Sequence, residues 1–321
     1  MKKSLLLIII LFSHLLCLAQ GDFSRGEGSV TFTKYEPLSS KPVTLHYYIP
    51  TRGNVESMYV LFVMHDSKRD GKYELETWKD FAERDGFVVL APEFKKEYYN
   101  QTEYQRGGIT YSESNLKIRS KEKWTTQIIE AIFTYYKEET GSRASKYDIW
   151  GSAWGAQFIQ AFLISIPDAR IRTAVMSKAA NYIMPFPEGL TVDKDVFSWP
   201  FSLLDSPFGT NEYLKPLFDK HIIVHVGEED TRNGEGYPQD PASYAQGQNC
   251  NERARYFYNE SKNYAKENKM KFKWEFVEVP GVGSLSRSLV YGLSSRDRNN
   301  NRVYDINRVK KTAAYYLLFG Y

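Results

Sequence analysis

A short stretch near the middle of the chain constrains the fold more than any other. Residues 147–150 have the character of a buried strand, and Gly151-Ser152-Ala153-Trp154-Gly155 follows at once, before a helical pattern begins at Ala156. Glycines two positions before and two positions after Ala153 fit a turn so tight that side chains there would collide with their neighbours. The stretch therefore predicts a strand, a strained turn and a helix in direct succession.

The rest of the chain alternates short β-branched or aromatic runs with longer helical stretches, without a repeat. This alternation predicts an α/β fold with a mostly parallel central sheet and helices on both of its faces. The strands are expected at 43–48, 59–64, 87–91, 147–150, 173–177, 221–226 and 273–279. The helices are expected at 73–85, 121–140, 156–166, 250–268 and 309–319.

One segment departs from the alternation. Residues 181–211 contain four prolines and many aromatic side chains but have no clean period. Such a segment between a strand and a helix is typical of an irregular excursion over the sheet edge that caps a pocket.

The N-terminus has the layout of a secretory signal peptide. Two lysines precede an apolar run from Ser4 to Leu16, and small residues at Cys17 and Ala19 favour cleavage after Ala19. Cys17 also raises a lipoprotein alternative, but the bulky Leu15 and Leu16 before it argue against that signal. We therefore expect residues 1–19 to be removed and residues 20–321 to form one domain that is secreted or periplasmic.

Composition excludes several classes of protein. The 321 residues are 42% hydrophobic and 25% charged, which argues against disorder, and a net charge of +3 gives no reason to expect a nucleic-acid partner. No apolar segment after the signal is long enough to span a membrane. Cys250 is the only cysteine left, so no internal disulfide is expected, and we interpret it as a semi-exposed loop thiol.

A strand, tight turn and helix of this kind commonly carry a nucleophilic hydroxyl at the apex, where the helix N-terminus supplies donors for an oxyanion. Here the apex is Ala153. A methyl group has neither a lone pair to attack with nor a proton to give up.

Several motifs in the same order resemble the secreted esterase and polyester-depolymerase-like branch of the α/β-hydrolase superfamily over most of the chain. They are His65-Asp66 with the loop after it, Trp78, the run from Ala91 to Phe94, the run from Tyr104 to Gly107, the Gly151–Phe158 elbow, the loop from Val226 to Thr231, and the loop from Val279 to Ser284. The resemblance implies an α/β-hydrolase fold, a Ser-His-Asp triad and no cofactor.

The triad positions depart from that pattern. By the resemblance, Ala153 stands at the serine, Ser284 at the histidine, Asp66 at the glycine of the oxyanion loop and Ser152 at the residue before the nucleophile. Only the acid, Asp230, is retained. Without nucleophile and base, serine hydrolases keep roughly 10³–10⁴-fold catalysis over water, far below useful turnover.

Relocated machinery is the alternative. Ser152 or Ser284 could act with His65 and Asp230, although Ser152 lacks the glycine spacing of an elbow and His65 is expected to support the oxyanion loop. The pocket is expected to be lined by His65, Asp66, Ser152 and Trp154.

Other polar patterns have structural interpretations. His221 and His225 lie on one face of a strand, roughly 13 Å apart, too far to share a metal ion. The oxygen ligands at Asp297, Asn299, Asn301 and Asp305 resemble the start of a calcium loop, but the glycine and the final glutamate of such a loop are absent. No metal site is expected.

The sequence thus favours a protein of this fold that has lost ester hydrolysis and keeps a binding role. With 24 tyrosines in an aromatic content of 15%, a small molecule or a glycan is the expected kind of ligand. A relocated serine hydrolase is the alternative, and a decaying copy without a role is a third hypothesis.

Overall fold

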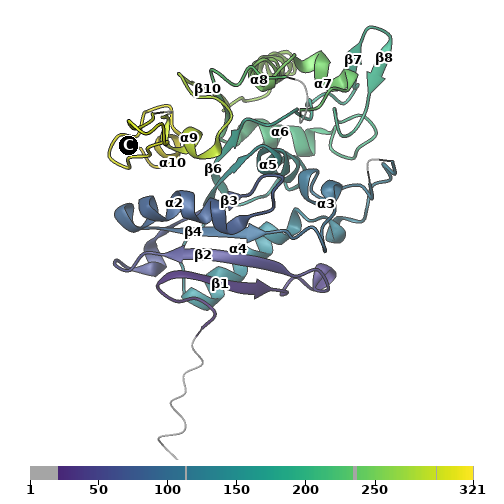
Figure 1. Cartoon of the computed structure of the whole chain (residues 1–321). Coiled ribbons are helices and arrows are strands. Elements are labelled where there is room, and N and C mark those ends of the chain that lie inside the picture. The colour runs from purple at the N-terminus through teal and green to yellow at the C-terminus, as the bar shows by residue number, and fades with distance from the viewer. Residues whose placement is uncertain (1–20, 113, 234–236, 294, 321) are drawn as a thin grey trace, which may run out of the picture.

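The computed structural model describes residues 21–112, 114–233, 237–293 and 295–320 (Figure 1). The expected signal peptide, residues 1–19, lies outside these ranges and stays a prediction. No helix in the described ranges is both long enough and apolar enough to cross a membrane.

An eight-stranded sheet forms the centre of the molecule, in the order β1-β2-β4-β3-β5-β6-β9-β10. The pairs β1–β2 and β2–β4 are antiparallel, and the other five pairs are parallel. Its strands are β1 (Gly26–Phe32), β2 (Val43–Ile49), β3 (Tyr59–Met64), β4 (Phe87–Glu93), β5 (Tyr147–Ser152), β6 (Ile171–Ser177), β9 (Ile222–Gly227) and β10 (Glu275–Val279).

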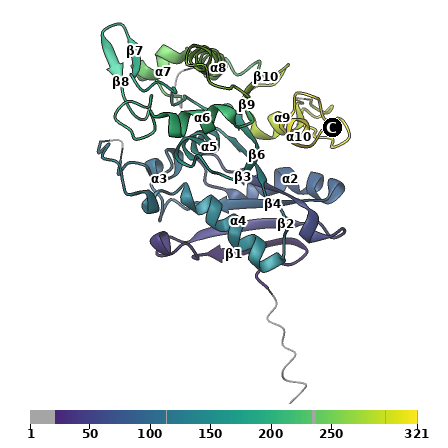
Figure 2. The same cartoon turned by 180° about the vertical axis from the view of Figure 1, so that it is seen from behind.

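Helices cover both faces of this sheet (Figure 2). One face carries α2 (Gly71–Asp85), α9 (Ser286–Tyr291) and α10 (Ala314–Phe319). The other carries α4 (Gln127–Thr140), α5 (Trp154–Ser165), α6 (Asn211–Asp219) and α8 (Cys250–Glu267). The remaining helices are α3 (Gln101–Gln105), α7 (Pro241–Gln246) and the 3₁₀ turns η1 (Glu36–Leu38), η2 (Val55–Ser57) and η3 (Lys121–Lys123).

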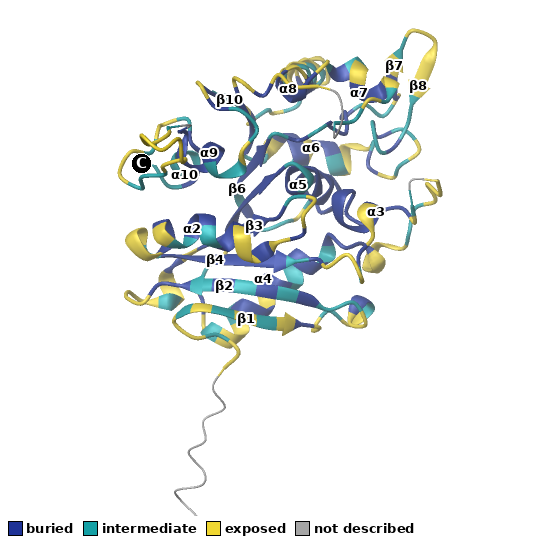
Figure 3. Cartoon of the chain, viewed as in Figure 1, coloured by how far each residue is buried: buried dark blue, intermediate teal, exposed yellow. Residues whose placement is uncertain are grey.

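The period of two along the strands divides the core into two layers. On β3, Val60, Phe62 and Met64 pack beneath the α5 face, whereas Leu61 and Val63 pack beneath the α2 face. Figure 3 shows the central strands as almost entirely buried, as expected for parallel strands that are covered on both sides.

The predicted fold class, a mostly parallel sheet with helices on both faces, is confirmed, and all seven expected strands are present. The edge strand β1 was not predicted, because its glycines and alternating polar residues lack the apolar signature of a buried strand. Two helices are shorter than expected: residues 121–140 begin with η3 before α4, and only Ala314–Phe319 of 309–319 is helical.

The excursion at 181–211 contains a small hairpin made of β7 (Leu190–Val192) and β8 (Asp195–Phe197). In Figure 1 it projects from the upper right of the molecule, on the same side as α3. The expectation of a semi-exposed Cys250 is wrong: the thiol is buried at the first turn of α8, and burial raises its pKa to about 12.

The α2 layer should depend on Phe81, which is fully buried, stacks on Tyr315 at 4.3 Å and packs against Tyr291 at 4.7 Å. We expect Phe81→Ala to lower the free energy of unfolding by about 3–5 kcal/mol in urea denaturation, because it leaves a cavity. Tyr73→Ala on the same helix is the matched control: its ring is 50% exposed, so a change within ~0.5 kcal/mol is expected. Equal losses in the two variants would contradict this assignment of the core.

Candidate functional site

Loops that follow the parallel strands gather at the carboxyl edge of the sheet. Ala153 follows β5, Lys178 follows β6, Asp230 lies after β9, Ser284 after β10, and His65 follows β3. Parallel strands bring their carboxyl ends to one edge, which is where open α/β sheets bind ligands. The sequence-predicted positions 65, 153, 230 and 284 therefore all lie at this edge of the sheet.

Ala153 occupies the strained turn between β5 and α5. Its φ of 52° and ψ of −113° lie in a region that residues with a side chain rarely adopt, at a cost of order 1–3 kcal/mol. Its N–H donates to the Ser177 carbonyl at 3.1 Å, and its own carbonyl accepts from the Gln157 N–H at 3.1 Å. The turn is thus held on both sides, and its apex is a half-buried methyl group.

Gly155 lets the first turn of α5 lie directly against the end of β3. A Cβ placed at Gly155 would collide with the Met64 carbonyl and would lie 2.9 Å from the His65 carbonyl oxygen. The Gln157 N–H donates the first intrahelical hydrogen bond of α5. The backbone N–H groups before it in the first turn have no partner within the helix and point out of its N-terminal end. This is the geometry of an anion-stabilising turn.

His65 is fully buried, with both ring nitrogens engaged. Its Nδ1 lies 3.0 Å from the Asp66 carbonyl oxygen, and its Nε2 accepts from the Phe94 N–H at 3.0 Å. Its ring stacks on Tyr104 at 4.2 Å, and the Tyr104 hydroxyl donates to the His65 carbonyl at 2.6 Å. Burial lowers the His65 pKa to about 3, so the neutral ring fastens the loop after β3.

Asp66 turns its carboxylate back on its own loop, where Oδ1 accepts from the Lys68 N–H at 2.8 Å. Its carbonyl accepts from the Arg69 N–H at 3.2 Å. Arg69 has a φ of 64°, and its guanidinium lies 4.3 Å from the Tyr104 ring and 5.6 Å from the Trp154 ring. Trp154, half-buried at the start of α5, thereby faces the loop after β3.

The two serines near the turn are also engaged. Ser152 is fully buried on the same side of the sheet as Trp150, and its hydroxyl lies 2.6 Å from the Ser286 hydroxyl of α9. It points away from the layer that contains α5. The hydroxyl of half-buried Ser284 accepts a hydrogen bond from the Arg232 guanidinium.

Asp230 is the most unusual group at this edge. It has no exposed surface, and neither carboxylate oxygen has a hydrogen-bond partner within the described ranges. Burial raises the pKa of Asp230 above its usual range, and the charges of Lys178 and Arg232 oppose this effect. A buried carboxyl without a donor costs free energy, and a group that supplied an N–H would recover it.

Lys178 and Glu74 are site residues that sequence reasoning missed. The half-buried Lys178, with a φ of 46°, lies close enough to lower the pKa of both Asp230 and Glu74. Glu74 in the first turns of α2 is 1% exposed, and burial together with Asp66 raises its pKa to about 8. Lys178 could have been found from the sequence, because it directly follows a predicted strand. Glu74 could not, because an acidic residue near the start of a helix is normally expected to face solvent.

The other polar patterns have partners within the fold. His221 lies between Thr173 and Glu275, His225 between Ser177 and the Thr312 carbonyl. The Asp297 carboxylate accepts from the backbone of Asn299 and Asn301. The described part of the chain holds no group of three or more His, Cys, Asp or Glu side chains suited to a metal ion.

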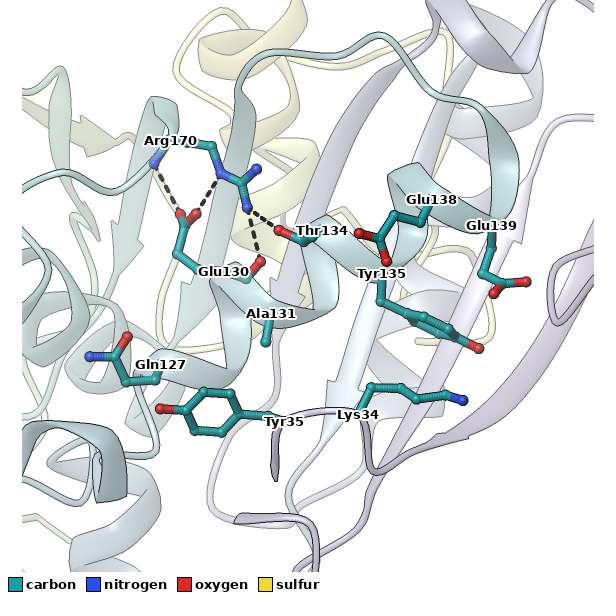
Figure 4. Close-up of a pocket in the computed structure, with 10 residues that line it drawn as sticks. All are labelled: Lys34, Tyr35, Gln127, Glu130, Ala131, Thr134, Tyr135, Glu138, Glu139 and Arg170. Carbon is teal, nitrogen blue, oxygen red and sulfur yellow. Dashed lines mark hydrogen bonds and ion pairs between the residues drawn. The ribbon is translucent and has the colours of Figure 1, made fainter. Parts of the chain in front are cut away.

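Two further hollows lie away from the turn at Ala153. One, of about 230 Å³, is lined by residues that include Arg232, Ser284 and Arg302. The other, of about 480 Å³, lies on α4; Figure 4 shows its Glu130 and Arg170 pointing at each other. In this ion pair Arg170 Nε lies 2.6 Å from Glu130 Oε2. Because Arg170 directly precedes β6, the pair lies at the edge of the sheet opposite Ala153.

Comparison with known proteins gives matches at the level of structure. No family model and no curated protein matches the sequence. Poly(aspartic acid) hydrolase-1 from Sphingomonas sp. KT-1 superposes with a TM-score of 0.74 at 29% identity, over 83% of this chain and 96% of that one. The poly(3-hydroxybutyrate) depolymerase LpqC from Bordetella parapertussis gives a TM-score of 0.74 at 21% identity, over 90% and 94%.

The close approach at Gly155 can be tested directly. Gly155→Ala should lower the free energy of unfolding by about 1–3 kcal/mol, because the methyl group must displace the backbone after β3. Gly283→Ala is the matched control in a neighbouring loop, since its Cβ would meet nothing nearer than 3.7 Å. Equal melting temperatures for the two variants would refute the predicted contact between α5 and β3.

The raised pKa of Glu74 makes a pH-dependent prediction. Between the ordinary value of 4.5 and about 8, the folded chain keeps a proton that the unfolded chain releases, so this carboxyl lowers stability as pH rises. Glu74→Gln should therefore be more stable than the parent at pH 9, by on the order of a few kcal/mol, and this advantage should disappear near pH 4.5. Urea unfolding at both pH values measures it; an advantage that does not change with pH would contradict the buried carboxyl.

Proposed function

We propose, from the premise that this chain has the α/β-hydrolase fold, that it is a non-hydrolysing member of an esterase-like branch and acts by binding. The scaffold supports this proposal because the elbow, the loop after β3 and the acid loop are all built. What differs is the chemistry of the side chains that they carry.

The relation between Ala153, Asp230 and Ser284 carries the proposal. In a serine hydrolase the acid holds an imidazole, and the imidazole takes the proton of the attacking hydroxyl. Here Asp230 has no donor within the described ranges, the Ser284 hydroxyl is taken by Arg232, and the apex at Ala153 offers only a methyl group. The described chain therefore holds an acid without an imidazole to orient and a turn without an attacking hydroxyl.

A relocated active site is less well supported. Ser152 would have to leave Ser286 and reach the other side of the sheet, and His65 would have to give up both the Asp66 carbonyl and the Phe94 N–H. Removing a buried hydrogen-bond partner costs about 1–3 kcal/mol for each group left unsatisfied. These contacts favour the non-hydrolysing role.

We also propose that the protein acts outside the cytoplasm. This rests on the N-terminal sequence alone, in which a basic start, an apolar run and the small residues before Gln20 form a signal peptide. Cleavage after Ala19 in a secreting host, read by N-terminal sequencing, would test it.

Hydrolysis can be tested by restoring the missing groups. Wild type should turn over p-nitrophenyl acetate and butyrate no faster than buffer, whereas Ala153→Ser/Ser284→His should gain on the order of 10²-fold or more, because nucleophile and base act as a unit. A fluorophosphonate probe should label the double variant but not wild type.

Two controls make the test decisive. Asp230→Asn in the double variant should remove most of the gain, since the acid must orient the restored imidazole. Wild-type turnover that disappears in Ser152→Ala or Ser284→Ala would overturn the proposal and establish the relocated enzyme.

A further inference from the structure

A second kind of site lies at the carboxyl side of the sheet, in a hollow whose described lining contains none of the elbow residues 151–155. Its volume of about 610 Å³ falls within the range of roughly 300–1,000 Å³ found for small-molecule sites. One wall is formed by α3 and the residues after it, up to Leu116, and the other by residues 196–201 of the cap. Figures 1 and 2 show α3 and the β7–β8 hairpin on the same side of the molecule.

A buried amide network forms the floor of this cleft. The Asn181 Oδ1 accepts from Gln157 at 2.6 Å and from Arg106 at 2.9 Å, and its Nδ2 donates to Ser243 at 2.8 Å. Gln105 donates to the Gln157 side chain at 2.7 Å. The polar groups are therefore fixed before any ligand arrives, which lowers the entropic cost of binding.

Aromatic rings form the cap wall. Phe197 and Phe201 lie 6.2 Å apart at 74°, both half-buried, and Trp199 packs behind them on Phe208 at 5.3 Å. The Trp199 indole N–H is buried without a hydrogen-bond partner in the described chain. A buried donor without a partner costs free energy, and a ligand oxygen that reached this N–H from the cleft would recover that cost.

The charges of the lining argue for a neutral ligand. Its one basic side chain, Arg106, donates to Asn181, and its one acidic side chain, Asp240, accepts from the Ser243 N–H at 2.9 Å and the Ser243 hydroxyl at 2.7 Å. The other polar groups are carboxamides and hydroxyls, which both donate and accept. One positive and one negative side chain leave the described lining without a net charge, so it offers no excess charge to attract a polyanion or an ammonium ligand.

We propose that this cleft binds a neutral oligosaccharide. A pyranose ring presents an apolar face that stacks on Phe197 or Phe201 and hydroxyl groups that both donate and accept, which matches aromatic walls over a fixed amide floor. The exposed Leu116 and Val196 at the mouth leave the cleft open to a longer chain. The proposal rests on the proposed binding role but not on the residues at 153 and 284.

Isothermal titration calorimetry with cellohexaose, xylohexaose, mannohexaose and laminarihexaose tests it. At least one should bind with a Kd between about 1 μM and 1 mM. Phe201→Ala should weaken that binding by about tenfold through loss of stacking, and Trp199→Phe by about threefold through loss of the N–H and the five-membered ring that carries it. Trp199→Phe keeps an aromatic side chain at this position, so it decides the matter if Phe201→Ala fails to fold.

The controls separate this cleft from the elbow. Tyr59→Ala removes a ring that is 52% exposed at the amino end of β3, and it should leave the Kd unchanged. Ala153→Ser/Ser284→His should also bind the sugar as wild type does. If wild type turns over no ester and binds no sugar, the cleft assignment is overturned and the proposed function is not. If wild type turns over esters, the proposed function is overturned.

Two further results would overturn the proposal of a neutral sugar. One is binding only of oligogalacturonate, which would mean an anion site. The other is binding only of a 3-hydroxybutyrate trimer, which would mean an acyl-ester site.

Discussion

The contact between the first turn of α5 and the end of β3 is the constraint on which the site depends. Gly155 allows the helix backbone to meet the Met64 and His65 carbonyls, and this approach forces the positive φ at Ala153. A turn so strained persists only because the packing around it over-determines its geometry. The molecule therefore holds a strained strand–turn–helix junction whose apex carries a methyl group.

Around that turn, burial and charge set the chemistry. Asp230 and Glu74 both lie in places that water does not reach, so their pKa values rise, and Lys178 opposes the rise in both. The His65 pKa falls for the same reason, because burial disfavours whichever form is charged.

Sequence reasoning placed the central strands well because each is a short apolar run whose signal is local. It missed β1, whose pairing with β2 lies at a half-exposed edge, and it overestimated the last helix, where residues 309–313 do not continue the turn. At the site it identified the positions 65, 66, 153, 230 and 284 as strand-end loops. It did not find Lys178, although that residue follows β6 as Ala153 follows β5.

The sequence by itself determined the alternation of strands and helices and the chemistry absent from position 153, because both are properties of residue type and spacing. Only the tertiary structure decided which partners hold His65 and Ser152, that Asp230 lacks a donor within the described chain, and that α3 and residues 196–201 line the same cleft. These are contacts between segments far apart along the chain. Their energies depend on burial and distance, which appear only when the chain has folded.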